Sequence, residues 1–322
     1  MPTLFFLKGL SFLYKIQHVF MMDKLSINAI QSGMKTSRLG RRIILLDMAA
    51  STNDAAWGYV GQPDCDGLCV LAEQQTAGRG RRGRIWHSQF GQSILCSLLI
   101  SASNYSPSLL TLAVPVAVAE SIAAICRLDA AVKWPNDVLL DGKKVAGILI
   151  ESKKDAVVVG IGINVHQGVE FFEAQPMDAP ATSLDIESGR RTDRNEFVRT
   201  LLEQLEYWLD QTAWAKPTLP ENSEIRSTKS ETNLKFKSSN DPNNLWEADD
   251  AGGSYPKNVV DEWKRRNRQI GTRLLLESDG QIYCGTCLGI DPADGLIVQL
   301  DSGAIRVFSP ATTTLIKNPA QD

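Results

Sequence analysis

The stretch Gly78-Arg79-Gly80-Arg81-Arg82-Gly83-Arg84 separates two apolar runs, residues 68–73 and 93–101, which have the length and composition of buried strands. Glycine gives such a stretch the backbone freedom to fold closely around a ligand. Arginine offers a planar fork of donors that matches phosphate or carboxylate oxygens. Because it lies between two strands, the stretch predicts an anion-binding loop of a folded domain. A solvated basic loop or a nucleic-acid patch is the alternative that these residues alone leave open.

The overall composition is that of an ordinary soluble globular protein. The chain has 322 residues, 43% hydrophobic and 22% charged, enough for one large or two modest domains. Its formal net charge is −3, so the arginine cluster is a local feature on a mildly acidic chain. A dedicated DNA-binding protein is more often basic overall, and we read no apolar run as long enough to span a membrane. We therefore expect neither DNA nor a membrane as a partner.

The cysteines and histidines indicate a reducing compartment and no bound transition metal. The six cysteines are scattered, mostly in apolar runs, and no secretory signal is evident. Cys284 and Cys287 form a C-x-x-C pair, but no second pair or nearby histidine completes a zinc set, and the three histidines lack metal-ligand spacing. We expect a cytoplasmic protein with buried thiols.

Residues 40–214 follow an alternating α/β pattern and form the expected catalytic domain. Its predicted strands are residues 43–46, 68–73, 94–100, 138–140, 145–151 and 156–165, and its main helices are residues 109–128 and 194–210. Asp141-Gly142 fits a tight primed turn and predicts a hairpin.

Three other segments flank this domain. Residues 1–39 form an N-terminal extension with a short helix over 23–34, and the sequence leaves open whether translation starts at Met1 or at Met21/Met22. Residues 215–257 are polar and predict an insertion or linker. Residues 258–322 begin with a short helix and continue, over 270–317, as short strands separated by turn residues, which predict a small SH3-like barrel.

Four further motifs accompany the arginine loop. Ser51-Thr52-Asn53 follows a predicted strand, where helix capping alone would explain it, and Gln75-Thr76-Ala77 leads into Gly78. Lys133-Trp134-Pro135-Asn136-Asp137 contains a proline that argues against a central strand. The hairpin carries Lys144-Val145-Ala146-Gly147-Ile148-Leu149, and the next strand ends in Gly160-Ile161-Gly162-Ile163-Asn164, whose glycines by themselves indicate only tight packing.

In this order and at similar spacing, the motifs and Trp86 resemble those of the biotin–protein ligase family, also called holocarboxylase synthetases. The resemblance covers about residues 40–210 and, more loosely, 258–317. It implies an α/β (α+β) fold: a mixed sheet with helices of the class II aminoacyl-tRNA-synthetase and biotin-ligase type, plus a small C-terminal SH3-like β-barrel. Because nothing before residue 40 is long enough for a winged-helix domain, the chain resembles members that ligate without repressing transcription.

The resemblance implies a two-step reaction. Biotin is activated with ATP to biotinyl-5'-AMP with release of pyrophosphate, and biotin is then transferred to a lysine of a biotin carboxyl carrier domain. Because the biotin carboxylate and the ATP α-phosphate are both anions, their meeting requires fixed positive charge. ATP brings Mg²⁺ as a co-substrate. A homodimer built by pairing of edge strands is common in the family, and the sequence leaves the oligomeric state and the carrier open.

The resemblance also assigns roles to residues. Catalytic roles fall to Lys144, which reaches both anions, and to Arg81, which helps retain the adenylate. The chemistry of the transfer step, rather than the resemblance, adds Asp137 as a candidate to accept the proton of the acceptor lysine. The implied biotin-binding residues are Ser51, Thr52, Asn53, Gln75, Gly78, Arg79, Gly80, Arg81, Trp86, Lys144, Gly147, Gly160 and Gly162. The implied ATP-binding residues are Arg79, Arg81, Arg82, Arg84, Trp86, Asn136, Asp137, Lys144 and Asn164.

The chemistry of biotin explains several of these residue types. Its ureido ring, with one carbonyl and two N–H groups, requires neutral donors and acceptors such as Ser51, Thr52 and Gln75. Gly160 and Gly162 would let a strand pass close to the ligand. Two alternatives stand beside this interpretation: a lipoate or octanoate ligase or transferase of the same fold class, and a non-catalytic nucleic-acid-binding protein.

Overall fold

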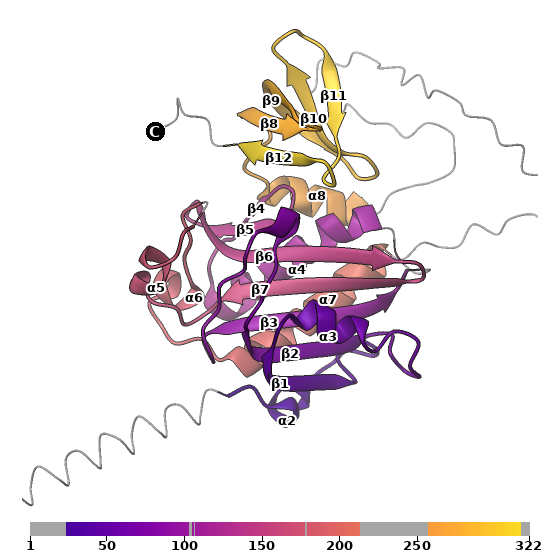
Figure 1. The fold of residues 1–322 in the computed structure, drawn as a ribbon, viewed down its shortest axis with the longest axis vertical. Coiled ribbons are helices and arrows are strands. Elements are labelled where there is room, and N and C mark those ends of the chain that lie inside the picture. Colours follow the sequence, from indigo (N-terminus) through magenta and orange to yellow (C-terminus); the bar gives the residue numbers. More distant parts are fainter. Residues whose placement is uncertain (1–23, 103–104, 106, 178, 213–256, 317–322) are drawn as a thin grey trace, which may run out of the picture.

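A mixed seven-stranded sheet forms the larger part of the molecule (Figure 1). The computed structural model describes residues 24–102, 105, 107–177, 179–212 and 257–316. The strand order is β1-β2-β3-β7-β6-β5-β4, in which β1 and β2 are parallel and every other neighbouring pair is antiparallel. The strands are β1 (Ile43–Ala49), β2 (Leu68–Gln75), β3 (Ser93–Ser101), β4 (Ala131–Lys133), β5 (Asp137–Leu140), β6 (Lys143–Lys153) and β7 (Ala156–Asn164).

Helices cover both faces of this sheet. They are α2 (Ile27–Gln31), α3 (Thr52–Trp57), α4 (Pro107–Cys126), α5 (Val169–Glu173), α6 (Leu184–Ser188), α7 (Arg194–Thr212) and α8 (Lys257–Arg266). Alternate residues of a strand point to opposite faces, so β2 contributes to two hydrophobic clusters. Cys69 and Leu71 join the main core with α4 and α7, whereas Leu68 and Val70 pack in a smaller cluster beside α3.

The predicted hairpin and the two long helices are confirmed. Asp141 and Gly142 both have positive φ, 46° and 73°, as a primed turn requires, and β5 pairs with β6 around them. The helix predicted over 23–34 is shorter: α2 ends at Gln31, and Gly33 with φ of 74° turns the chain away.

The expectation that no apolar run is long enough to span a membrane is wrong as a statement about length. The α4 segment Leu109–Cys126 is long and apolar enough, with a hydropathy of 2.1. However, 72% of that segment is buried inside the protein, where it packs against β5, β6 and α7. Its apolar character is therefore that of a core helix.

The C-terminal strands form a second sheet beyond α8 (Figure 1). Its order is β11-β10-β9-β8-β12, with β8 (Arg273–Ser278), β9 (Gln281–Asp291), β10 (Gly295–Leu300), β11 (Ile305–Phe308) and β12 (Thr313–Ile316). All neighbouring pairs are antiparallel. The barrel is not closed, because β11 and β12 are the two edges of this sheet and do not pair with each other in the described part of the chain.

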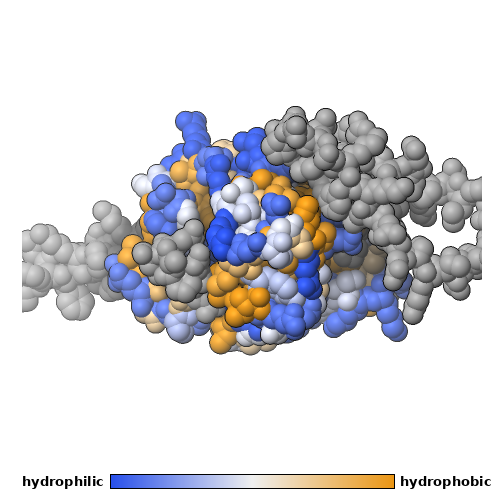
Figure 2. Space-filling model, turned by 90° about the horizontal axis from the view of Figure 1, so that it is seen from above, coloured by the Kyte–Doolittle hydropathy of each residue, from blue (hydrophilic) through white to orange (hydrophobic). Residues whose placement is uncertain are grey.

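The second sheet is joined to the first through α8 and the residues after it. Asn267 forms a bridge with Val132 of β4, and the Gln269 side chain accepts a hydrogen bond of 2.6 Å from the Trp134 backbone. Seen from the end that carries this sheet, hydrophobic and hydrophilic surface is intermixed (Figure 2). The predicted 215–257 insertion and the N-terminal residues 1–23 lie outside the described residues, except for Lys257, and the division into domains stays a prediction.

Candidate active site

A cavity of about 460 Å³ brings the predicted motifs together. Its walls come from the start of α3, the arginine loop, the segment 133–137, the paired strands β6 and β7, the segment 176–181 and strand β12. Every residue that the sequence predicted for the site lines this cavity except Gly78. Gly78 is buried, and a Cβ there would lie 2.6 Å from the Trp86 carbonyl oxygen. The close approach of the loop therefore requires glycine here, and the predicted part of Gly78 in biotin binding stays a prediction.

One end of the cavity is lined by neutral polar groups. Ser51 stands at the N-cap position of α3, but its side chain makes no capping hydrogen bond, so capping does not explain this residue. Ser51 and Thr52 are 5% and 4% exposed, which leaves the cavity as the place where they can meet a ligand. The Thr52 backbone N–H and hydroxyl lie 2.7 and 2.9 Å from Gln75 Oε1. We call this the head end of the cavity.

Asn53 lines the cavity, but its side-chain amide is engaged by buried protein groups. Its Nδ2 donates to Glu151 Oε2 at 2.9 Å, and its Oδ1 lies 2.6 Å from the hydroxyl of Ser97. Gly160 makes room for this side chain, because a Cβ there would lie only 2.2 Å from Asn53 Oδ1. Gly160 also lines the cavity, so its predicted role, close approach of a strand to the ligand, stays a prediction beside this close approach to Asn53.

Trp86 forms a flat wall over two other glycines. A Cβ at Gly162 would lie 2.5 Å from Trp86 Cε2, and one at Gly147 would lie 3.0 Å from Trp86 Cζ3. The glycines thus let the indole lie close to the strands β6 and β7, and the ring remains part of the cavity wall. An apolar, planar surface of this kind suits a ring system or an alkyl chain.

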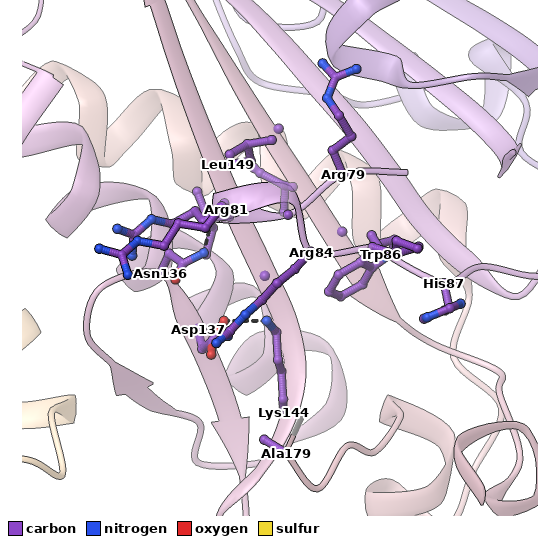
Figure 3. Close-up of a pocket in the computed structure, with 18 of the residues that line it drawn as sticks. Arg79, Arg81, Arg84, Trp86, His87, Asn136, Asp137, Lys144, Leu149 and Ala179 are labelled. Atoms are coloured by element: carbon purple, nitrogen blue, oxygen red, sulfur yellow. Dashed lines mark hydrogen bonds and ion pairs between the residues drawn. The ribbon is translucent and has the colours of Figure 1, made fainter. Parts of the chain in front are cut away.

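The other end of the cavity is cationic. Lys144 Nζ lies 2.6 Å from Asp137 Oδ1, and Figure 3 shows Arg84 beside this pair with Arg81 near Asn136. Burial lowers the pKa of Arg81, and the like charges of Arg82 and Arg84 lower it further, against the opposing effect of Asp137. A cluster of partly desolvated cations is stabilised by an anion. We call this the anion end of the cavity.

Lys144 is fixed through its backbone as well as its side chain. Its N–H donates to the Pro180 carbonyl at 2.9 Å, and its carbonyl accepts from Thr182 at 3.0 Å. These bonds hold Pro180 and Thr182 against β6, and Met177 and Ala179 from the same part of the chain line the cavity. This wall could not be predicted from the sequence, because no residue type in it signals a ligand and only the pairing with Lys144 places it there.

Arg79 and Arg82 are directed elsewhere than predicted. Arg79 pairs with Asp54 at 2.5 and 2.6 Å and lies 3.6 Å from Glu151, so its guanidinium does not join those of Arg81 and Arg84 (Figure 3). The hydrogen bond from Arg79 lowers the pKa of Asp54, and the same bond raises the pKa of Arg79.

Arg82 reaches the C-terminal sheet. Its guanidinium lies 2.8 Å from Glu277 Oε2 and also contacts the Thr312 carbonyl, while Arg81 contacts the Pro310 carbonyl. Thr314 and Leu315 of β12 complete the cavity wall. The arginine loop is therefore held between the two sheets, an arrangement that no local sequence pattern predicts.

The two asparagines of the predicted nucleotide site are committed to the backbone. Asn136 Nδ2 donates to the Ile148 carbonyl at 2.8 Å, and Asn164, 4% exposed, donates to the Thr182 carbonyl at 3.1 Å. Both residues line the cavity. Their side chains hold the segments that form its walls, so their first role here is structural.

The cavity offers little to a protein-held metal. Within the described ranges, no group of three or more His, Cys, Asp or Glu side chains is placed to hold one. Among the described residues that line the cavity, Asp137 is the one with a carboxylate side chain, and this carboxylate is already paired with Lys144.

The sequence of this chain is similar to those of known ligases. The profile of the Biotin/lipoate A/B protein ligase family matches residues 45–167. The bifunctional ligase/repressor BirA of Bacillus spizizenii is 31% identical over 294 residues, 89% of this chain and 78% of that protein. The biotin–[acetyl-CoA-carboxylase] ligase of Mycobacterium tuberculosis is 36% identical over 194 residues, 58% of this chain and 71% of that protein.

The fold also matches a solved structure. The biotin protein ligase from Aquifex aeolicus in complex with biotin and ATP aligns with a TM-score of 0.64 and 23% identity, over 86% of this chain and all of that one (100%). At this identity the likeness concerns the fold alone. The mixed sheet and the C-terminal antiparallel sheet are thus shared features of both structures.

Proposed function

Since the chain belongs to the biotin/lipoate A/B protein ligase family, we propose that it is an ATP-dependent biotin–protein ligase that forms biotinyl-5'-AMP and passes biotin to a lysine of a carboxyl carrier domain. The observation that carries the proposal is one cavity with a neutral polar head end, a Trp86 wall and a cationic end at Lys144 and Arg81. Its relatives with similar sequences are named as ligases that act on acetyl-CoA carboxylase.

In the first step, a biotin carboxylate oxygen attacks the α-phosphorus of ATP and pyrophosphate leaves. Negative charge increases on the phosphoryl oxygens in the transition state. Lys144 Nζ and the Arg81 guanidinium, which are held in fixed positions, stabilise this charge. Asp137 positions Lys144 through the 2.6 Å ion pair. Mg²⁺ is expected to enter with ATP and to be held chiefly by phosphate oxygens.

In the second step, the neutral amine of the acceptor lysine attacks the acyl carbon of the mixed anhydride, and AMP leaves. The amine proton needs an acceptor, and Asp137 is the candidate on this wall of the cavity. The arginine loop, held between the two sheets, would keep water from the adenylate. The six cysteines are free thiols, which supports the expected cytoplasmic location.

The carrier domain and a second copy of the chain are the proposed partners. Transfer requires the acceptor lysine to enter a cavity that is bordered by the arginine loop and β12. A homodimer could form at β1, which is an edge of the seven-stranded sheet. Sedimentation of the purified protein tests the dimer, and biotin incorporation into a carboxyl carrier domain tests the acceptor.

The decisive assay is pyrophosphate release from ATP with biotin, lipoate or octanoate offered separately. We expect release that depends on biotin and falls at least 100-fold in Lys144→Ala, since one preorganised charge contributes about 10²–10³-fold. Arg81→Ala should also reduce release. The matched control is Lys143→Ala, which removes the adjacent lysine; its Nζ pairs with Glu187 at 2.9 Å and does not line the cavity.

The same assay separates the alternatives. Release with lipoate or octanoate and not biotin would keep the family and replace the substrate. If folded protein releases no pyrophosphate with any of the three acids, the ligase proposal is wrong and the arginine loop has a binding role.

A further inference from the structure

A buried serine connects the residues of the head end. Ser97 of β3 is 0% exposed and does not line the cavity. Its Oγ lies 2.7 Å from Thr52 Oγ1 and 2.6 Å from Asn53 Oδ1. One hydroxyl group thus touches two consecutive residues at the start of α3, directly behind the cavity wall.

The Gln75 amide has a defined orientation because of Thr52. A backbone N–H can only donate, so the 2.7 Å contact from Thr52 N identifies the Gln75 atom as the acceptor Oε1. The Gln75 oxygen is therefore engaged within the protein. Its NH₂ group is the part of the side chain that remains to serve a ligand, and it can only donate.

The Asn53 amide is oriented by the residues on its other side. Its Nδ2 lies 2.9 Å from Glu151 Oε2 and 3.4 Å from the Leu149 carbonyl, both of which accept. The Oδ1 atom therefore faces Ser97. Because Asn53 is 3% exposed and both ends of its amide are engaged, it supports the head end rather than offering groups to a ligand.

Thr52 is left as an acceptor toward the cavity. Its hydroxyl proton has two protein oxygens within reach, Gln75 Oε1 at 2.9 Å and Ser97 Oγ at 2.7 Å. Whichever of them takes the proton, the lone pairs of Thr52 Oγ1 are what the hydroxyl can offer to a ligand. Ser97 holds this hydroxyl in place from behind.

We propose that Ser97 is a positioning residue that fixes the donor and acceptor pattern of the head end, so that the cavity selects a cyclic urea. Gln75 offers donors, Thr52 offers an acceptor, and Ser51 can do either. A cyclic urea presents one carbonyl acceptor and two N–H donors, which complement this set. The inference rests on the proposed biotin ligase activity and names the residue behind its selectivity over acids without a urea.

The test is Ser97→Ala, which leaves Thr52 and Asn53 without the shared hydroxyl. We expect the Kd for biotin, measured by calorimetry, to rise roughly tenfold, the usual effect of one lost buried hydrogen bond in a recognition site. Desthiobiotin, which keeps the urea, should lose affinity by a similar factor. The KM for ATP and the kcat at saturating biotin should change less than about twofold, because Ser97 is remote from the anion end.

Two further variants keep the test interpretable. Ser97→Cys retains the size and a weak donor, so it should lie between wild type and Ser97→Ala, and it serves if the alanine variant fails to fold. Ser121→Ala is the matched control, since Ser121 is 0% exposed on α4 and its hydroxyl donates to the Ala117 carbonyl at 2.7 Å, away from the cavity.

The outcomes distinguish the two proposals. If folded Ser97 variants bind biotin as tightly as wild type, Ser97 has no positioning role. The same conclusion follows if their loss of affinity is no larger than that of the Ser121→Ala control. If the KM for ATP rises and kcat falls in parallel with the loss of biotin affinity, Ser97 has a general structural role, and the inference is overturned. If wild-type protein binds no biotin at all, the proposed function fails and this inference fails with it.

Discussion

Adding one methyl group at Gly162 tests whether the Trp86 wall is fixed by the glycines beneath it. In Gly162→Ala the new Cβ would lie 2.5 Å from Trp86 Cε2, 2.8 Å from Cζ2 and 2.9 Å from Nε1. Carbon atoms in contact prefer about 3.5–4.0 Å, so the indole must move by about 1 Å. It can move only away from the sheet, into the space that biotin or its adenylate would occupy.

The expected magnitude follows from that displacement. Overpacking of this kind costs about 1–3 kcal/mol of stability, and a misplacement of about 1 Å beside the reacting groups costs roughly 100-fold in rate. We expect biotin-dependent pyrophosphate release to fall by about that factor, whereas the Tm should fall by only a few degrees. Gly147→Ala should lose less activity, because its Cβ would meet Trp86 Cζ3 at 3.0 Å and the flexible end of Lys144 at 3.2 Å.

The control is another strand glycine that has free space around it. Gly289 lies in β9, and a Cβ there would have no atom within 4 Å. Gly289→Ala should therefore keep wild-type activity. The reasoning is refuted if Gly162→Ala is as active as Gly289→Ala at an unchanged Tm, or if Gly147→Ala loses more activity than Gly162→Ala.

The remaining predictions concern charge. Glu277→Gln should free Arg82 and speed tryptic cleavage of the arginine loop several-fold, whereas Asp301→Asn, which breaks an ion pair on the same C-terminal sheet, should not; equal cleavage rates would contradict the contact between loop and sheet. Hydrogen bonding from Arg265 lowers the pKa of Glu262 from 4.5 to about 2. A lowered carboxyl pKa stabilises the fold above the unfolded value and loses that effect as the pH falls, so Glu262→Gln should lower the Tm at pH 7, and its difference from wild type should shrink between pH 4.5 and 2. A pH-independent difference would show that packing, not ionisation, is what the variant removes.

Much of the fold could be predicted from local sequence signals. The Asp141-Gly142 turn, the apolar strand at 93–101 and the amphipathic helix that became α7 were all correct, because turn chemistry and hydrophobic periodicity act over a few neighbouring residues. The SH3-like barrel expected for residues 270–317 is confirmed as an antiparallel sheet, whose strands do not close into a barrel. The individual strands have clear signals, but closure depends on whether the two edge strands meet, which no single strand encodes.

The candidate site was predicted as a set of residues and not as an arrangement. Ser51, Gln75 and Lys144 were correctly expected to lie together, because rare motifs in one order select a known kind of cavity. Ser97 was missed, since a serine within an apolar strand gives no signal until its neighbours in space are known. Gly162 was chosen for a ligand that passes close to it, whereas the structure places the Trp86 indole there.

Local patterns in the chain were sufficient to predict the helices and strands, the α/β domain that they build, and a site shared by cationic and neutral polar groups. The direction of each side chain at that site depends on contacts between distant segments. Arg79 turns to Asp54, 25 residues away, and Arg82 to Glu277, 195 residues away. The physical reason is that a charged side chain takes its direction from the partner that folding brings near it, and such partners come from segments whose proximity no local pattern encodes.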